Sequence, residues 1–197
     1  MSPSSEKSSS ECIAAREISN EYSAQERTQL LQLAHASIAS VFTREEFPRE
    51  PPSAHFAEHR GVFTTLYSRG ELRGCVGYVM PIVSLYRSVI ETSRAAAFDD
   101  PRFAPLLAQE LPALKVSLSI LSPLAPIQPA QVEIGHHGLL ITLGDRHGLL
   151  LPQVPLEHGW DRTEFLAQTC RKAGLPRDAW LTGATLEAFS AEIFGEN

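Results

Sequence analysis

The same sequence pattern for a hairpin and a helix occurs twice along this chain, and this repetition limits the folds that the chain can adopt. A β-hairpin pattern, a proline and a capped helix follow one another at about residues 61–98 and again at about 138–173. Few residues match between the two copies, so their shared order suggests a duplicated β-β-α unit. The pattern predicts the α+β class: two closely packed subdomains with largely antiparallel sheets, built from hairpin-plus-helix units with flanking helices.

The first copy lies in the stretch GVFTTLYSRGELRGCVGYVMP and the residues after it. It predicts strands at 61–67 and 72–79, joined by a turn in which Gly70 can take a positive φ. Ser84 then has the position of a helix cap, and the apolar spacing predicts a helix that runs to about Phe98.

Two elements flank this first copy. Ser23 and Glu26 have the spacing of a capping box and predict a helix over about 24–42. Later, the stretch ALKVSLSIL alternates apolar and polar residues, which predicts a half-buried strand from about Leu114 onward.

The second copy has its hairpin in GLLITLGDRHGLLLP, with a turn expected around 144–148. Asp161 is placed to cap the following helix, and Gly174 to end it. The last apolar segment, ATLEAFSAEIF, has Phe189 and Ile193 on one parity, which favours a strand over a helix.

Composition narrows the class of protein. The formal net charge is -6 and the pI about 5.6, so we expect no nucleic-acid partner. The cysteines are three and widely spaced, which indicates a reducing cytoplasm rather than a disulfide framework. No signal peptide and no apolar run of about eighteen residues is present, so no membrane partner is expected. Residues 1–20 read as a flexible serine-rich tail before a domain at 21–197.

A cysteine lies beside an arginine and between two glycines in the stretch LRGCVGY, residues 72–78. Side chains alternate along a strand, so Arg73 and Cys75 share a face, with Cα atoms roughly 6.5 Å apart. A guanidinium there either lowers the pKa of the thiol or anchors a carboxylate or phosphate. Gly74 and Gly77 permit close approach by a ligand or by another backbone.

A purely structural interpretation remains open for the same residues. Cysteine is often a buried, inert core residue. Arg73 would then bond a carboxylate such as Asp99 or Asp100 of the FDDPRF loop.

The segment HFAEH matches the H-x-x-E-H pattern of some zinc proteases through His55, Glu58 and His59. Prolines precede it and a strand starts soon after, so only a turn or two of helix fits. We therefore interpret these as surface loop histidines and expect no metal.

The remaining histidines and cysteines give weaker signals. A convergence of four histidines near the second hairpin is not expected, and they read as solvated or turn residues: His136, His137, His147 and His158. Cys170 is expected to face the core of a helix, and Cys12 lies in the tail. Trp160 and Asp161 are expected to anchor and cap that helix.

The motif LRGCVGY resembles the hallmark of the AMMECR domain family, whose prokaryotic members are called AmmeMemoRadiSam system protein A. The resemblance covers about residues 22–196 and includes, in family order, AAAFDDPRFAPL, LKVSLSILSPL, GLLLPQV and GWDRTEFLAQTCRKAGLP. Tyr78 stands where the family usually has a small residue. The resemblance implies two subdomains with a cleft near 72–78. It also implies association with a Memo-like protein and a radical-SAM protein, but no particular reaction.

Two functional hypotheses follow. In the first, the chain is an enzyme or enzyme component that acts on a small anionic or carbonyl substrate, with Cys75 as nucleophile and Arg73 beside it. In the second, the same cleft docks a Memo-like or radical-SAM partner without catalysis. Ligand-binding candidates are Gly74, Gly77, Arg102 and Gln153. No cofactor is expected, since no Walker loop, dinucleotide fingerprint or radical-SAM cysteine triplet occurs.

Overall fold

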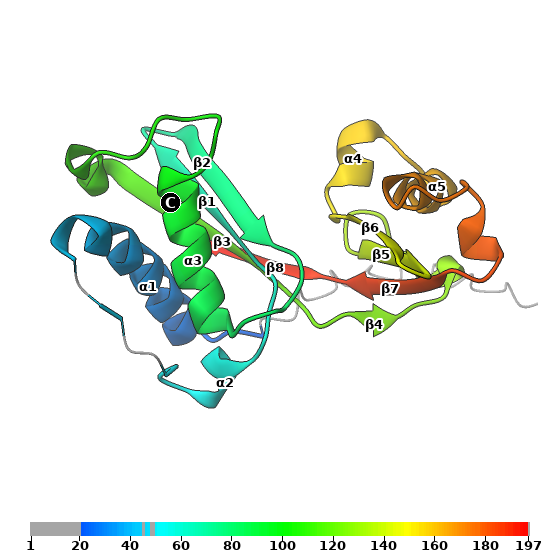
Figure 1. Ribbon diagram of the computed structural model, residues 1–197, viewed down its shortest axis with the longest axis horizontal. Helices are drawn as coiled ribbons and strands as arrows, with labels where there is room; N and C mark the ends of the chain where they lie inside the picture. The colour runs from blue at the N-terminus through cyan, green and yellow to red at the C-terminus, as the bar shows by residue number, and fades with distance from the viewer. Residues whose placement is uncertain (1–20, 45, 48–49, 197) are drawn as a thin grey trace, which may run out of the picture.

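The chain forms two lobes joined by a narrow waist (Figure 1). The structure is a computed structural model, and it describes residues 21–44, 46–47 and 50–196. The expected tail at 1–20 therefore lies outside the described residues. The first lobe contains α1 (Ala24–Thr43), α2 (Ala54–Ala57), β1 (Val62–Ser68), β2 (Glu71–Tyr78), α3 (Leu85–Phe98), the 3-10 helix η1 (Ala108–Ala113), β3 (Leu114–Leu121) and β8 (Ala191–Gly195).

The first lobe is a four-stranded antiparallel sheet in the order β2-β1-β3-β8, with its helices on one face. Alternation along β1 explains this layering. Val62, Thr64 and Leu66 are buried under α3, whereas Thr65 and Tyr67 point to the other face and are partly or largely exposed. The core between sheet and helices also includes Leu30, Ala34, Ile38, Leu85, Val89, Val116, Leu118 and Ile120.

Local signals in the first lobe act as expected. Ser23 and Glu26 form a capping box at α1, and the Ser84 side chain accepts the N–H of Arg87 at α3. The β1–β2 turn has φ of 53° at Arg69 and 84° at Gly70, as a two-residue hairpin turn requires. The predicted helix and strand positions of this lobe are confirmed within one or two residues.

The second lobe is also a four-stranded antiparallel sheet, in the order β4-β7-β5-β6. Its helix α5 packs on β5 and β6 over a separate apolar core that includes Leu139, Ile141, Phe165, Leu166 and Cys170. Its elements are β4 (Ala125–Pro126), η2 (Pro129–Gln131), β5 (Gly138–Leu143), β6 (Arg146–Leu150), α4 (Val154–His158), α5 (Arg162–Lys172), η3 (Ala179–Leu181) and β7 (Thr185–Phe189).

Two predictions in this lobe need correction. The hairpin turn is tighter than 144–148, because Arg146 already pairs with Leu143 and leaves only Gly144 and Asp145 between the strands. The final apolar segment is two strands, since the chain leaves the ladder at Ser190 between β7 and β8. The helix prediction holds: Asp161 caps α5, and Gly174 follows its end with φ of 68°.

The two copies of the repeated pattern have the same topology. In each lobe a hairpin is followed by a helix and then by a strand that pairs with the first hairpin strand, giving β2-β1-β3 and β6-β5-β7. The next strand of each copy crosses to the other lobe, where β8 pairs with β3 and β4 pairs with β7. The exchange is reciprocal, so each sheet is completed by a strand that follows the other unit in the chain.

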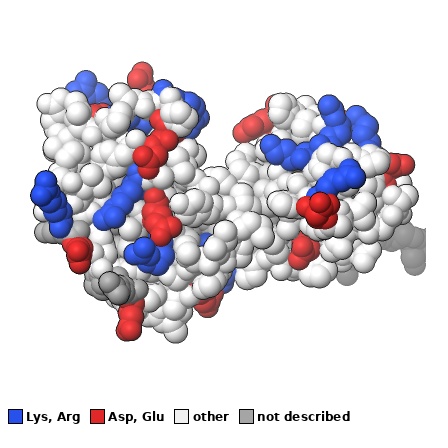
Figure 2. All heavy atoms as spheres, viewed as in Figure 1, with Lys and Arg blue, Asp and Glu red and all other residues white. Residues whose placement is uncertain are grey.

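The surface carries both signs of charge. In the view of Figure 2, basic and acidic side chains alternate over both lobes, and the waist has few of either. Among the described residues, no helix is long and apolar enough to cross a membrane.

Candidate functional site

The face of the first sheet opposite to α1 and α3, here called the open face, carries Cys75. A row of small residues crosses all four strands there, because Cys75 pairs with Thr65, Thr65 with Ser117, and Ser117 with Gly195. Cys75, Thr65 and Ser117 are half-buried, in contrast to the fully buried Thr64 one position away. This row gives a polar, shallow surface with a thiol at one edge.

The thiol of Cys75 lies 3.4 Å from the hydroxyl oxygen of Thr65, and either atom can be the donor. Its partner on the neighbouring strand is thus a hydroxyl rather than an imidazole or a carboxylate. Cys170 has the opposite character: it is fully buried in α5, and burial raises the pKa of its thiol. The expectation that Cys170 faces the core is confirmed, and Cys12 lies outside the described residues.

Asp100 and Arg102 hold the backbone of Cys75 from outside the sheet. β2 is an edge strand, so without them the outward N–H and C=O of Cys75 would lack a ladder partner. Asp100 Oδ2 accepts the Cys75 N–H at 2.8 Å, and Arg102 Nη2 donates to the Cys75 carbonyl oxygen at 3.4 Å. The segment Asp100–Arg102 therefore closes part of the sheet edge.

The two side chains are themselves paired. Arg102 Nη2 lies 2.7 Å from Asp100 Oδ2, and Arg102 Nε lies 3.0 Å from Oδ1. The hydrogen bond from the Arg102 guanidinium, followed by that from the Cys75 N–H, holds the pKa of Asp100 well below its usual range. The Asp100 carboxylate is buried, whereas the Arg102 side chain is 55% exposed. A cation thus faces solvent beside Cys75.

Arg73 does not pair with Cys75. A bulge interrupts the β1–β2 register at this residue, and its guanidinium forms a two-pronged ion pair with Glu110 of η1, at 2.8 and 3.2 Å. Arg73 in turn lowers the pKa of Glu110. The structural alternative is confirmed in that Arg73 bonds a carboxylate, but its partner is Glu110 of η1 and not Asp99 or Asp100.

A groove of about 500 Å³ lies along this part of the hairpin, lined by Ser68, Arg69, Glu71, Leu72, Arg73, Gln109, Glu110 and Ala113. All of these residues belong to the first lobe. The groove is therefore next to the LRGC motif, but not between the lobes.

The glycines of the motif have a packing role. A Cβ at Gly74 would lie 2.0 Å from the backbone oxygen of Ala96, so α3 crosses directly over this strand. A Cβ at Gly77 would lie 2.2 Å from the ring of Phe63. The close approach expected at both positions is made by the protein itself, and a role in ligand binding stays a prediction.

Gln153 lies apart from the motif. It lines a groove of about 410 Å³ to which both lobes contribute, together with Arg27 and Glu192 of the first lobe and His136 and Leu156 of the second. The structure thus brings Arg102 to Cys75 but puts Gln153 in a different groove. Tyr78, at the end of β2, is 40% exposed.

The other candidate residues of the second lobe have local roles. Asp161 caps α5 through the N–H of Glu164 at 2.8 Å, and Trp160 packs against the second core, as expected. The rings of His136 and His137 contact each other at 4.7 Å between centroids, because they lie in a turn rather than in a strand.

Thr65 is the residue near the thiol that sequence reasoning missed. Its signal was the register of the hairpin: a two-residue turn at Arg69 and Gly70, with the bulge, brings it opposite Cys75. The sequence offers Asp100 as a carboxylate for Arg73, whereas in the structure Asp100 accepts the Cys75 N–H and the Arg102 guanidinium.

Comparison with known proteins identifies the family. The AMMECR1 family model matches residues 31–194. The chain belongs to the AMMECR1 family. It is 40% identical to protein MK0488 of Methanopyrus kandleri over 85% of this chain and 86% of that protein. It is 43% identical to protein TK0174 of Thermococcus kodakarensis over 85% of this chain and 88% of that protein.

A solved structure extends the family likeness to the fold. The crystal structure of the uncharacterized protein PH0010 from Pyrococcus horikoshii matches with a TM-score of 0.67 at 39% identity, covering 86% of this chain and 90% of that one. The AMMECR1 assignment and the mixed α+β fold of two antiparallel sheets thus agree.

Proposed function

We propose that this AMMECR1 protein binds a small anionic or carbonyl compound on the open face, with Cys75 as the thiol that meets it and Arg102 as the cation that attracts it. The observation that carries the proposal is that one strand edge presents a half-buried thiol and, bonded to the backbone carbonyl of the same residue, a 55% exposed guanidinium. Arg102 replaces Arg73 in the role of anion anchor. Both guanidiniums pair with a carboxylate, but Arg102 bonds the Cys75 carbonyl and has a side chain that is 55% exposed, whereas the Arg73 side chain is 15% exposed and is directed to Glu110.

The chemistry that suits this arrangement is thiol addition. The Cys75 sulfur adds to a carbonyl carbon, the C=O pair moves to oxygen, the thiol proton leaves to water, and the oxygen takes a proton from water. The hydroxyl of Thr65 next to the sulfur offers a hydrogen bond at either stage. Arg102 would hold a carboxylate of the same compound. The family resemblance supports a place in a Memo-like and radical-SAM system, as an enzyme or enzyme component.

The test compares a charged and a neutral alkylating agent on Cys75. The measured quantity is the rate of Cys75 alkylation by iodoacetate divided by its rate of alkylation by iodoacetamide, in a chain with Cys12→Ser. We expect this ratio to be higher for Cys75 than for a free thiol in solution. A unit charge at about 4 Å is worth about 1 kcal/mol in water, so Arg102→Ala should lower the ratio of the two rates by about threefold or more. Peptide mass spectrometry at Cys75 gives both rates.

Two variants make the comparison specific. Arg102→Lys keeps the charge and should keep most of the ratio. Arg87→Ala removes another exposed arginine, on α3, and should leave the ratio unchanged. An unchanged ratio in Arg102→Ala would rule out Arg102 as an anion anchor.

A second candidate function is docking of a Memo-like or radical-SAM protein on the same face. It is favoured by apolar side chains that remain exposed there, with Ile193 67% and Tyr67 38% exposed. A pull-down with each of those proteins, using wild type, Ile193→Ser and Arg73→Ala, tests docking. Capture by wild type that is lost in Ile193→Ser supports it, and no capture of either protein argues against it.

A further inference from the structure

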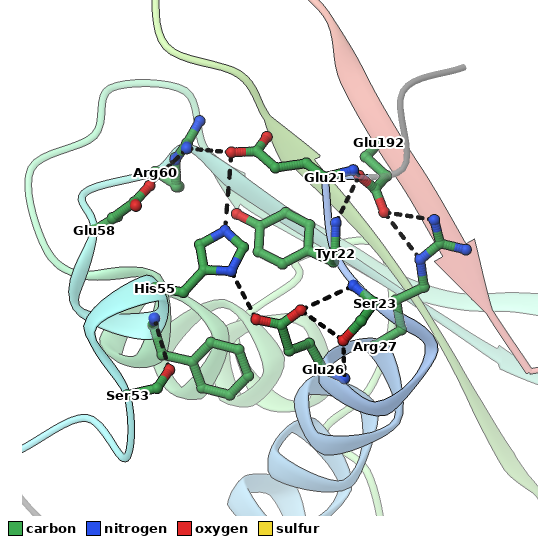
Figure 3. A network of polar contacts seen from close by, with 11 residues as sticks. Glu21, Tyr22, Ser23, Glu26, Arg27, Ser53, His55, Glu58, Arg60 and Glu192 are labelled. Atoms are coloured by element: carbon green, nitrogen blue, oxygen red, sulfur yellow. Dashed lines mark hydrogen bonds and ion pairs between the residues drawn. The ribbon is translucent and has the colours of Figure 1, made fainter. Parts of the chain in front are cut away.

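A cluster of ionisable side chains lies on the first lobe, outside the Cys75 site. Glu21 precedes α1, His55 is in α2, and Glu58 lies in the connection from α2 to β1. One ligand atom from each of these three residues lies within 4.8 Å of the other two. Figure 3 shows the three side chains converging from separate segments of the chain.

The ring of His55 is held in a defined orientation. Its Nδ1 lies 2.7 Å from Glu26 Oε1, and its face stacks on Tyr22 with centroids 4.5 Å apart and planes 8° apart. The N–H and the hydroxyl of Ser23 both donate to the other oxygen of this carboxylate, Glu26 Oε2, so Glu26 is the acceptor in this network. Nδ1 therefore carries a hydrogen, and the lone pair of a neutral ring lies on Nε2.

Nε2 then faces a second acceptor. Glu21 Oε1 lies 3.9 Å from His55 Nε2. The same Glu21 oxygen accepts from Arg60 Nη2, so a metal ion between Nε2 and Oε1 takes the place of that contact. Ligands at about 2.1 Å from a tetrahedral ion lie roughly 3.4 Å apart, so this spacing needs only a small adjustment to hold a metal. A carboxylate on the other ring nitrogen is also the usual second partner of a metal-bound histidine.

Two buried polar atoms beside the cluster have no hydrogen-bond partner among the residues that the structure describes. They are the Tyr22 hydroxyl and Arg60 Nη1, although Tyr22 is 1% exposed and the Arg60 side chain 7%. In Figure 3 the Tyr22 hydroxyl points toward the space where Glu21, His55 and Arg60 meet. Buried hydroxyls are normally satisfied, so this one indicates a missing partner, such as a water carried by a bound ion.

Arg60 now occupies the cation position. Its Nη2 bonds both Glu21 and Glu58, the latter at 2.6 Å. A metal ion must displace this contact, so Arg60 and the ion compete for the same carboxylates. A variant that lacks the Arg60 guanidinium should therefore bind the metal more tightly.

We propose that Glu21, His55 and Glu58 bind a divalent cation of the zinc type, in exchange with Arg60. One imidazole with two carboxylates suits Zn²⁺, and Co²⁺ is its spectroscopic substitute. The HFAEH segment thus contributes His55 and Glu58, while Glu21 takes the place that His59 has in the H-x-x-E-H pattern.

The experiment uses the full-length, tag-free chain with Cys12→Ser, so that the tail thiol binds no metal. Co²⁺ absorption and Zn²⁺ calorimetry at pH 7.5 are compared for this chain and for Glu58→Gln, His55→Ala and Arg60→Gln. We expect one equivalent of metal, affinity at least tenfold weaker in Glu58→Gln and His55→Ala, and tighter binding in Arg60→Gln. Glu58 is largely exposed, so Glu58→Gln tests the site even if His55→Ala misfolds.

His59→Ala is the matched control, because His59 belongs to the same segment but not to the cluster. Its affinity should equal that of the parent chain. The proposal is overturned by the absence of stoichiometric binding, by binding that persists in Glu58→Gln, or by an equal loss in His59→Ala. Absence of binding would mean that a proton on His55, with Arg60, satisfies the carboxylates.

Discussion

The backbone amide of Cys75 is the point where two distant segments of the sequence meet. Asp100 comes 25 residues after Cys75, yet its carboxylate accepts the Cys75 N–H and the Arg102 guanidinium together. This contact links the stretch RGC, residues 73–75, to the stretch DPR, residues 100–102. The thiol is presented by an edge strand whose backbone is fixed from outside.

The carboxylate of Asp100 makes stability depend on pH. Its folded pKa is depressed, so its stabilising effect is present above the unfolded value near 4 and is lost as pH falls below it. Asp100→Asn does not titrate and loses the ion pair. Urea unfolding should show wild type more stable than Asp100→Asn at pH 7, with the difference shrinking below about pH 5 and continuing to shrink until the pH reaches the depressed pKa of the folded Asp100. A difference that stays constant with pH would contradict this role.

Gly74 is expected to be intolerant of a side chain. Gly74→Ala puts a methyl group against the Ala96 carbonyl of α3, which should cost about 3 kcal/mol or more of unfolding free energy. Gly70→Ala in the same hairpin has open space and bears only the cost of a positive φ, about 1 kcal/mol. Chemical denaturation of both variants checks the order. Equal losses would mean that α3 does not press on β2 as described.

At the scale of elements, the two β-β-α units share one helix-to-strand contact. The second strand of each hairpin has a glycine where the helix crosses it: Gly74 lies under Ala96, and a Cβ at Gly148 would lie 2.3 Å from the Ala173 nitrogen. The helices therefore approach their hairpins at corresponding positions. The duplication suggested by the order of signals is thus matched by a corresponding contact.

The strand β8 is tied to the start of α1 by one buried carboxylate. Glu192 accepts the N–H groups of Glu21 and Tyr22 and lies 2.8 Å from the Arg27 guanidinium. Glu192→Ala leaves these donors unpaired and should cost about 2–3 kcal/mol in chemical denaturation. Glu91→Ala, at an exposed ion pair on α3, should cost less than about 0.5 kcal/mol. A loss of unfolding free energy as small as this for Glu192→Ala would contradict the role of Glu192 in holding β8 to the start of α1.

Elements specified by local signals could be predicted from the sequence. Caps at Ser23, Ser84 and Asp161 place three helices, and alternation in 114–121 places a strand, because each depends on neighbours a few residues away. The partner of Arg73 could not be predicted. It depends on a bulge in the β1–β2 ladder and on the position of η1, both of which tertiary packing sets.

The whole molecule is held together by its two crossings. At the waist, the Ser122 N–H bonds the Ser190 carbonyl at 2.9 Å, and the Ser190 N–H bonds the Ser122 hydroxyl at 3.0 Å. Each crossing also delivers a strand to the opposite sheet. The lobes therefore exchange strands. The order of signals along the chain does not predict this exchange, because it does not determine which strands pair with one another.

Removal of β8 should affect the first lobe rather than the second. A chain that ends at residue 189 leaves the β3 edge unpaired and lacks Glu192, so we expect loss of a cooperative thermal transition for the first lobe. A synthetic peptide of residues 190–197 should restore it in part. Glu91→Ala, at an exposed ion pair on α3, is the control and should leave the melt intact. A normal melt without β8 would contradict the exchange.

The accessibility of Cys75 tests the central claim, that the open face presents a usable thiol. The Cys12→Ser protein is treated with iodoacetamide while folded, and each remaining cysteine is measured by peptide mass spectrometry. We expect Cys75 to be modified in the native protein, while Cys170, fully buried in α5, reacts only after urea unfolding. A Cys75 that is protected to the same degree as Cys170 would contradict it.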